Sequence, residues 1–533
     1  MAFSPLQLVP NASTALAVVG VGVLVYVYLV TTYPDRAIGT RPRPDIPGRK
    51  GLPIFGNTFH ILKKSGETLD RLLEIHQAFG EPNTTTMLGV GRIITINRPD
   101  WIEHVQKRNF ENYVKGSYSY GVLKDLLGDG IFNVDGEHWK YQRKVASRNF
   151  TISNMRDIIA PILRHELQVL EDILDKHAAA GTSVDLQDLY FRFTLSAFVR
   201  MAFGTDIGSL SSPEKPHAFA EAFDYAQEIA SRRFVKPGWK FSEIFSQEGR
   251  KMRKAIGIIN QTIDDIVTER QSGKGTNANK GGPKDLLQLF LDYRHDAEDA
   301  QGNRTALTKT ELREVLLNLL LAGRDTTAES LSWASFRLIQ YPEAQERFVK
   351  EVAKHDLVDE VDFDATKVSP APVYQETLRL HPSVPRMSKI AVGDDVIPNG
   401  GPRVEAGDIV SWSDWVMGRS RAIWGPDAPT WQPERWIVRS DEKEGGGEEQ
   451  VRTETQWKFH AFNGGPRLCL GATMAQFQGL SVLARVFGKF TFEPLVDIPA
   501  DGSARPYNLT LTLPMKEPLT VRVHRRVGKA RTL

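Results

Sequence analysis

A single cysteine, Cys469, constrains this 533-residue chain more than any other feature of its sequence. Disulfide-stabilised proteins need cysteines in pairs and structural zinc sites use several, so neither class fits. The cysteine lies in residues 462–471, FNGGPRLCLG, whose glycines let the backbone pass close to a flat, bulky group. Arg467 would favour a thiolate and bind an acidic group of a cofactor. These residues leave two interpretations open: a thiolate ligand, or a free thiol buried in the core.

The same segment resembles a known haem-binding motif. The pattern F-x-x-G-x-R-x-C-x-G is filled by Phe462, Gly465, Arg467, Cys469 and Gly471, and it is similar to the haem signature of the cytochrome P450 monooxygenases. The resemblance implies haem b as the cofactor. It also implies that Cys469 is the axial iron ligand and that Phe462, Arg467 and Gly471 bind the cofactor.

Composition places the chain among ordinary globular proteins. It is 41% hydrophobic and 25% charged, which is sufficient for a large core. The formal net charge of +2 argues against a protein that binds nucleic acid by neutralising phosphates. We find no internal repeat and no GxxxxGK(S/T) phosphate loop.

The amino-terminal 34 residues contain no charged side chain, and residues 15–30 form an apolar run close to the ~20 residues that a bilayer span needs. Residues 35–56 form a basic connector rich in proline and glycine. A cleaved signal peptide is the alternative, but no basic stretch precedes the run and no convincing cleavage site follows it. We expect residues 1–34 to be a single-pass anchor, with its N-terminus in the lumen and residues 57–533 in the cytosol.

The periodicity of apolar residues predicts a mainly α-helical domain with a minor β part. Most of the chain up to Tyr341 shows helical spacing. Thr308 and Glu311 form a capping box that begins a long helix, Pro342 ends it, and its apolar character predicts burial. Alternating residues predict a hairpin at 84–96 and a second one at 507–523.

Trp139 and Arg143 are four residues apart, so a helix places them on one face. Without further context, they indicate a Trp in the core and an Arg that extends past it to solvent. The W-x-x-x-R pattern resembles the P450 helix that donates to the haem propionates, which implies a cofactor-binding role for both. The preceding residues 127–136, LGDGIFNVDG, resemble fungal alkane and fatty-acid terminal hydroxylases and related plant fatty-acid hydroxylases.

An acid and two hydroxyls interrupt the long apolar helix at residues 322–327, AGRDTT. Such departures from local rules cluster at functional sites. The alternative is that the hydroxyls bond back to a carbonyl one turn earlier without a functional role. The segment resembles the oxygen-activation site of P450s, where a helix irregularity makes room for dioxygen. The resemblance implies that Thr326 holds activated oxygen and that Asp325 relays protons.

Glu376 and Arg379 are three residues apart, hence neighbours on a helix. Such pairs are common on surfaces and are worth little there. The E-x-x-R pattern resembles a second P450 signature, which implies that Arg435 completes a buried cluster that supports folding and haem retention. Two features depart from the family: an abrupt lead-in at 369–373, and Lys389 where an Arg usually reaches a propionate. A lysine binds anions without the bidentate geometry of Arg.

Residues 231–240, SRRFVKPGWK, are basic and aromatic. They suit either a solvated loop or, by resemblance, the membrane-facing substrate entrance.

Together, these motifs resemble a P450 fold, with a single large haem domain behind an N-terminal transmembrane helix. The implied reaction inserts one oxygen atom of O2 into a C–H bond, with electrons from NADPH through cytochrome P450 reductase and possibly cytochrome b5. The implied location is the endoplasmic reticulum membrane. The resemblance favours terminal or near-terminal hydroxylation of a fatty acid or alkane. The alternatives are a terpenoid, sterol or xenobiotic substrate, or a haem protein that binds or isomerises without O2.

Overall fold

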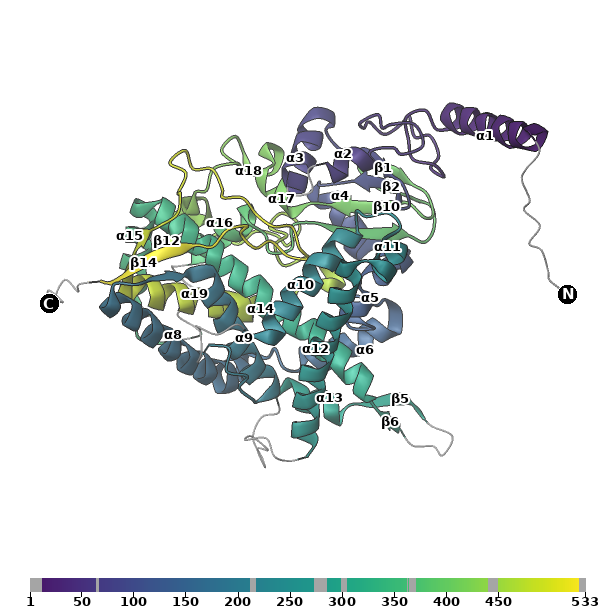
Figure 1. The fold of residues 1–533 in the computed structure, drawn as a ribbon. Helices are drawn as coiled ribbons and strands as arrows, with labels where there is room; N and C mark the ends of the chain where they lie inside the picture. The colour runs from purple at the N-terminus through teal and green to yellow at the C-terminus, as the bar shows by residue number, and fades with distance from the viewer. Residues whose placement is uncertain are drawn as a thin grey trace.

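The structure is a computed structural model that describes residues 12–63, 67–210, 217–272, 285–298, 304–361, 363, 371–439 and 449–526. Helices dominate it, as the apolar spacing predicts (Figure 1). The helices of the first half are α1 (Ala12–Thr32), α2 (Thr58–Leu62), α3 (Thr68–Phe79), α4 (Pro99–Glu103), α5 (Gly116–Leu127), α6 (Gly136–Ser147), α7 (Ile152–Asn154), α8 (Ala160–Ala180), α9 (Leu186–Phe203), α10 (Ala218–Arg233), α11 (Trp239–Phe245) and α12 (Gln247–Gln271). Those of the second half are α13 (Leu286–Asp292), α14 (Lys309–Gln340), α15 (Pro342–Lys354), α16 (Ala371–Leu380), α17 (Asp414–Arg419), α18 (Arg421–Trp424) and α19 (Ala472–Lys489).

Short strands make up the minor β part. They are β1 (Asn83–Met87), β2 (Gly91–Thr95), β3 (Tyr113–Val114), β4 (Ser183–Asp185), β5 (Arg294–Glu298), β6 (Arg304–Ala306), β7 (Met387–Ala391), β8 (Asp395–Val396), β9 (Arg403–Val404), β10 (Ile409–Trp412), β11 (Ile437–Arg439), β12 (Glu449–Val451), β13 (Phe490–Pro494) and β14 (Thr520–Arg525). The largest sheet has the order β1-β2-β10-β7-β3. The predicted hairpin at 84–96 is confirmed as the antiparallel pair β1–β2. Within this sheet Val410 pairs with Lys389, which fixes Lys389 on an inner strand.

The predicted C-terminal hairpin is wrong in its first half. Residues 507–513 form no strand, and only an isolated bridge joins Tyr507 to Met515. Helix side chains bind this turn instead: Trp333 Nε1 donates to the Leu513 carbonyl (2.8 Å), and the Leu513 N–H donates to Glu329 (2.9 Å). The second half becomes β14, which pairs with β13 and β4.

Helix α14 runs through the core and contacts α9, α12, α16 and α19. Thr308 and Glu311 form the predicted capping box at its start, and it ends at Gln340, one residue before the predicted end. Buried side chains surround most of its length, as expected for a helix that is apolar on all sides. It packs tightly against α9, because a Cβ at Gly323 would lie 1.9 Å from the Phe198 ring.

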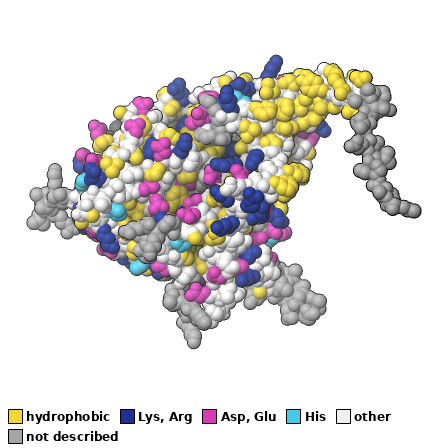
Figure 2. Space-filling view, in the orientation of Figure 1, with side chains coloured by type: hydrophobic (Ala, Val, Ile, Leu, Met, Phe, Trp, Pro, Cys, Tyr) yellow, Lys and Arg dark blue, Asp and Glu magenta, His cyan; other side chains and the backbone are white. Residues whose placement is uncertain are grey.

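Helix α1 lies at one edge of the molecule, away from the main body (Figure 1). Its described side chains from residue 16 onward include exposed apolar groups such as Leu16 (72% exposed) and Leu24 (70%), which form a hydrophobic surface in Figure 2. Among the residues that the structure describes, no helix has the length and apolar character needed to cross a membrane.

Candidate functional site

The cysteine loop connects a short 3₁₀ turn, η8 (Gly465–Arg467), to α19. Gly465 has φ +63°, and a Cβ there would lie 2.6 Å from the carbonyl oxygen of Gln106, so only glycine fits without strain. The N–H of Cys469 donates to the Phe462 carbonyl (2.9 Å), which closes the loop. The Cys469 side chain is accessible, although enough protein surrounds the thiol to desolvate it partly.

The environment of the Cys469 thiol has opposing effects on its pKa. Desolvation by the surrounding protein raises the pKa, whereas the Gly471 N–H and the charge of Arg143 lower it. Arg143 Nη2 also donates to the Leu468 carbonyl (2.7 Å), immediately before the cysteine. A cysteine thiol therefore lies next to a fixed cation, which favours its thiolate form.

A buried polar network holds the cysteine loop against η2 (His104–Arg108), a π-helical turn. His460 contacts Asp414 through Nδ1 (2.6 Å) and Gln106 through Nε2 (2.9 Å). Gln106 in turn donates to Asn463 (2.5 Å) at the start of the loop. No sequence pattern joins these residues, since His460 and Gln106 are 354 positions apart.

Trp139 and Arg143 lie on one face of α6, as the spacing predicts. The guanidinium carbon of Arg143 is 5.8 Å from the Trp139 ring centroid, and that of Arg467 is 4.4 Å from it. Trp139 therefore contacts two arginines, Arg143 on its own helix and Arg467 in the cysteine loop. Trp139 is buried and Arg143 is half-buried, so the simpler interpretation of a core Trp beside a partly exposed Arg also describes this pair.

Three cations from distant parts of the chain meet beside this loop: Arg467, Lys115 and Lys389. Lys389 is only 4% exposed, and its Nζ has no hydrogen-bond partner among the described residues. Burial, followed by the charges of Lys115 and Arg467, lowers the Lys389 pKa well below its usual value. Burial and Arg467 also lower the pKa of Lys115 to about 8. The sequence did not predict Lys115 as a site residue, because no motif includes it.

Asp135 only partly compensates this positive charge. It accepts from Arg467 Nη2 (2.6 Å) and from the backbone N–H of Lys115 (2.8 Å). Burial still lowers the Arg467 pKa to about 10. Buried cations are costly unless they are paired, so this cluster has the charge and chemistry that acidic groups would satisfy.

The glycine-rich segment after α5 is attached to α14 by two polar side chains. Buried Asn318 donates to the Leu127 carbonyl (2.8 Å) and accepts from the Phe132 N–H (3.0 Å). Glu314 accepts from the Asp129 N–H (3.0 Å). A Cβ at Gly130 would lie 1.8 Å from the Asn318 amide, which explains the glycine. These contacts hold the segment between α5 and α6 against α14, and Trp139 and Arg143 follow it in α6.

The acid and hydroxyl at the centre of α14 are both present, but the helix irregularity implied by the resemblance is not, because α14 is continuous from Lys309 to Gln340. Thr326 Oγ1 donates to the Ala322 carbonyl (2.7 Å), which is the bond of the simpler alternative. Asp325 is buried and accepts from Arg324 Nη1 (2.8 Å). Burial raises the Asp325 pKa to about 6, although Arg324 opposes the rise.

Glu376, Arg379 and Arg435 come together as expected, within a buried cluster. Arg379 donates to both carboxylate oxygens of Glu376 (2.7 and 2.6 Å). Arg435 Nε is 3.6 Å from Glu376, while its guanidinium also pairs with Asp427. Helix α16, which carries the first pair, begins at Ala371. Residues 369 and 370 of the expected abrupt lead-in lie outside the described residues.

Residues 231–240 comprise the end of α10, a partly exposed turn at 234–238 and the start of α11. Arg233 ends α10, is 2% exposed and forms an ion pair with Glu243 (2.6 Å). Its guanidinium carbon lies 4.1 Å from the ring of Trp239, which begins α11. Phe241 and Phe245 on α11 are 77% and 81% exposed, so this helix presents an apolar surface.

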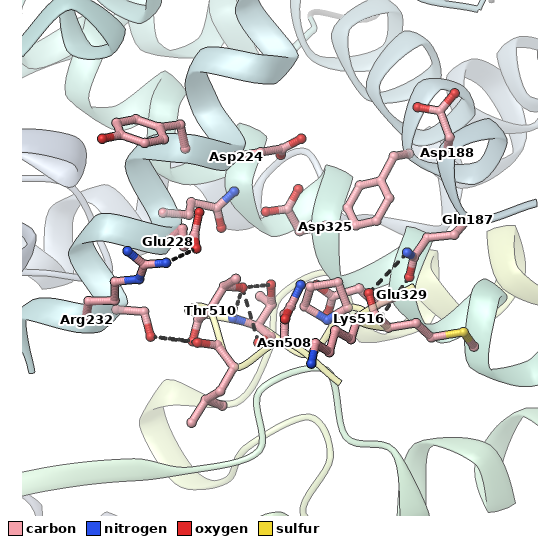
Figure 3. Close-up of a pocket in the computed structure, with 18 of the residues that line it drawn as sticks. Gln187, Asp188, Asp224, Glu228, Arg232, Asp325, Glu329, Asn508, Thr510 and Lys516 are labelled. Atoms are coloured by element: carbon pink, nitrogen blue, oxygen red, sulfur yellow. Dashed lines mark hydrogen bonds and ion pairs between the residues drawn. The ribbon is translucent and has the colours of Figure 1, made fainter. Parts of the chain in front are cut away.

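A pocket of about 650 Å³ lies between α10, α14, the start of α9 and the turn at 508–518 (Figure 3). Much of its lining is polar and includes Asp224, Glu228, Asp325, Glu329 and Thr510. Neither Cys469 nor Thr326 lines it.

Comparisons with known proteins assign this architecture to one family. The cytochrome P450 family model matches residues 46–514. The chain is 43% identical over 523 residues to cytochrome P450 monooxygenase cyp1 of Mycosarcoma maydis, covering 95% of this chain and 79% of that protein. It is 32% identical to cytochrome P450 94A1 of Vicia sativa, over 84% of this chain and 85% of that one. It is 33% identical to cytochrome P450 86B1 of Arabidopsis thaliana, over 80% of this chain and 76% of that protein.

The chain therefore belongs to the cytochrome P450 family. It is a monooxygenase of mainly helical P450 fold. Proteins of this family bind haem through a cysteine thiolate and use O2 and electrons from a reductase.

The residues present fit this cofactor. Cys469 is the one cysteine in the sequence, and its side chain is exposed beside Arg143. The incompletely compensated cluster of Lys115, Lys389 and Arg467 matches the acidic groups of a haem.

Proposed function

We propose that Cys469 is the axial ligand and that the surrounding residues hold the haem. The acidic groups of the haem are bound by Arg467, Lys389 and Lys115. The observation that supports this role is that nearby acids compensate the charge of these three residues only in part, and that Lys389 Nζ has no hydrogen-bond partner among the described residues. Trp139 and Arg143 pack against the cysteine loop. Phe462 and Gly471 are the first and last residues of that loop. When bound, the haem supplies the activation of O2. The Glu376–Arg379–Arg435 cluster supports the fold behind the loop.

Asp325 and Thr326 move protons in this proposal. The Thr326 hydroxyl already donates to Ala322, so it can exchange this hydrogen bond for one to a ligand beside the helix. Asp325 is a buried acid with a pKa near 6, close to the working pH of a general acid–base group. The protein groups thus hold and transfer the protons that reduction of one oxygen atom to water requires.

The substrate we propose is a fatty acid or alkane, hydroxylated at or near its terminal carbon. The support is the resemblance of residues 127–136 to terminal hydroxylases, and the contacts of this segment with Asn318 and Glu314 on α14. These contacts bring the segment beside the helix that carries Asp325 and Thr326. A terpenoid, sterol or xenobiotic substrate has no comparable support from a named segment.

We also propose that residues 1–34 form a single-pass anchor in the endoplasmic reticulum membrane, with residues 57–533 as the cytosolic haem domain. The support is the absence of charge in residues 1–34 and the exposed apolar side chains of α1. Phe241, Ile244 and Phe245 on α11 add a second apolar surface for the bilayer. NADPH–cytochrome P450 reductase, possibly with cytochrome b5, supplies electrons from the cytosolic side.

The first test is the reduced, carbon-monoxide difference spectrum of wild type and Cys469→Ser. Wild type should show the Soret shift of a thiolate ligand, and the variant should lose it. A wild type without this shift would refute the haem–thiolate assignment. Lauric acid and a matched alkane are then supplied with reductase and NADPH. Normal spectra without turnover of either compound would remove the substrate proposal alone.

The second test replaces Thr326 with Ala. The variant should divert NADPH from product to hydrogen peroxide, because the proton-holding hydroxyl is lost. Ser332→Ala is the matched control, since Ser332 also donates to a carbonyl one turn back (2.8 Å), two turns further along α14. Unchanged coupling in Thr326→Ala would contradict the assigned role.

A further inference from the structure

The residue immediately before β7, Arg386, is a cation without a partner in the lining of the polar pocket. Its side chain is half-buried, and none of the described residues forms a hydrogen bond or an ion pair with its guanidinium. Burial lowers the Arg386 pKa, and the nearby Tyr118 and Tyr507 oppose this shift. Because arginine keeps its charge in proteins, this wall of the pocket is positive.

The other cations that line the pocket have their charge compensated. Arg232 forms an ion pair with Glu228, and the side chain of Lys516 is exposed, so water solvates its ammonium group. A charge that is removed from solvent is normally paired, because desolvation without a partner is costly. Since the described part of the chain gives Arg386 no such partner, its charge points to an anionic ligand from outside the chain.

The carboxyl groups of the pocket repel an anion less than their number suggests. Three of them, on α9 and α10, each form an ion pair with a different arginine: Asp188, Asp224 and Glu228. In the other three, burial raises the pKa and so weakens the negative charge: Asp185, Asp325 and Glu329. The positive charge of Arg386 is therefore available to a ligand.

The backbone that carries Arg386 has a fixed position relative to α14. Ser383 Oγ donates to the Thr326 carbonyl (2.9 Å), and the Pro385 carbonyl accepts from Ser413 Oγ (3.0 Å). Pro385 also restricts its own backbone, because its ring fixes φ. Arg386 lies three residues after Ser383, so their Cα atoms are at most about 10 Å apart. A group bound to Arg386 is thus held near the segment proposed to move protons.

The geometry of a guanidinium favours a carboxylate, which it binds through two parallel charge-assisted hydrogen bonds. Of the two substrates proposed above, a fatty acid has this group, whereas an alkane would leave the cation desolvated and unpaired. The polar pocket of about 650 Å³ suits the head of such a molecule. Thr326 does not line it, so the hydrocarbon chain would leave the pocket to reach the reactive side of α14.

We propose that Arg386 is a specificity-determining residue, which binds the carboxylate of a fatty acid and selects it over alkanes and uncharged esters. The inference rests on the substrate class proposed above and narrows it to molecules with an acidic head. Arg386 takes no part in the reaction, because it binds the end of the substrate remote from the C–H bond that is hydroxylated.

The first test measures binding to the ferric holoenzyme, by titration with laurate and with methyl laurate and the change in Soret absorbance. Wild type should bind laurate roughly ten- to hundredfold more tightly, as a charge-assisted pair predicts. Arg386→Gln should weaken laurate binding by this factor and leave methyl laurate unchanged, and Arg386→Lys should restore part of the affinity. Arg232→Gln is the matched control, because Arg232 lines the same pocket but is paired with Glu228.

The second test measures turnover with reductase and NADPH. Arg386→Gln should raise the KM for laurate and change kcat little, because the carboxylate does not react. Unchanged laurate affinity in this variant, or equal loss for both compounds, would overturn the inference. Equal affinity of wild type for laurate and methyl laurate would do the same, and this comparison needs no variant. Turnover of an alkane but not of laurate would overturn the inference alone, whereas turnover of neither would refute the proposed substrate class.

Discussion

At the scale of single residues, Lys389 is a buried lysine whose charged form costs stability. Its ammonium lies on an inner strand with no hydrogen-bond partner among the described residues, close to Lys115 and Arg467. The sequence placed a lysine where the family usually has arginine. In the structure this lysine joins a positive cluster that Asp135 compensates only in part.

Replacing Lys389 with Met should weaken haem retention and stabilise the haem-free chain. The folded-state pKa of Lys389 is depressed, so the charged form favours the unfolded chain. Wild-type stability is therefore lost as pH falls from the ordinary lysine value of 10.5 through the folded-state pKa, and it stays lost below. We expect the Met variant to gain about 1–3 kcal/mol at neutral pH, with the gain disappearing above the lysine value.

Two measurements check this prediction: denaturant unfolding of the haem-depleted proteins against pH, and haem transfer to apomyoglobin. Lys389→Arg is the control, because it keeps the cation and adds a planar fork for acidic groups. A Met variant that retains haem as well as wild type would show that Lys389 does not bind the cofactor.

At the scale of elements, α16 shows that a Glu–Arg pair at the same spacing can contribute little or much to stability, depending on its burial. Glu376 and Arg379 could have been an exposed pair of little value, as the sequence alone allowed. The structure buries both and surrounds Glu376 with the Gln432 N–H (2.8 Å) and Trp436 Nε1 (2.9 Å). Arg379 also donates to the Ala428 (2.6 Å) and Thr430 (2.9 Å) carbonyls, so the cluster joins several segments of the chain.

Glu376→Gln should destabilise the protein by about 3–5 kcal/mol, because it leaves the Arg379 charge buried without its partner. Glu434→Gln provides the comparison, since Glu434 pairs with Arg347 at the surface, where such pairs contribute about 0–1 kcal/mol. Denaturant unfolding of the holoenzymes measures both. Equal effects of the two substitutions would mean that the cluster is not a structural centre.

At the scale of the whole molecule, α1 and α11 share an exposed apolar character. Figure 2 shows hydrophobic side chains over α1 and the adjoining edge of the body. Phe241 and Phe245 contribute to α11, next to Arg233, which links α10 to Trp239. An apolar surface of this kind on a catalytic domain is typical of a protein that contacts a membrane.

Deleting residues 1–34 should greatly reduce flotation of the enzyme with phospholipid vesicles, and adding Phe241→Ser and Phe245→Ser should abolish what remains. Each buried aromatic contributes roughly 1.5–3 kcal/mol to partitioning. The carbon-monoxide difference spectrum should stay unchanged, which controls for folding. Undiminished flotation after the deletion would contradict the anchor.

Local features of the fold were predictable because they depend on neighbouring residues. Helix spacing, the capping box at Thr308 and the β1–β2 hairpin follow from contacts within a few positions. The turn at 507–516 was not predictable in the same way. Its backbone groups pair with Trp333 and Glu329 rather than with a second strand, and no local pattern encodes that choice.

By itself, the sequence determined the family, the only cysteine available to bind iron, and the order of the motifs around it. Only the tertiary structure brought Lys115, Lys389 and Arg467 into one cluster and turned Arg143 toward the loop of Cys469. It also set Glu329 beside Asp325 at a polar pocket. The physical reason is that charge and desolvation act through space, so a buried group acquires its pKa from neighbours hundreds of positions away in the chain.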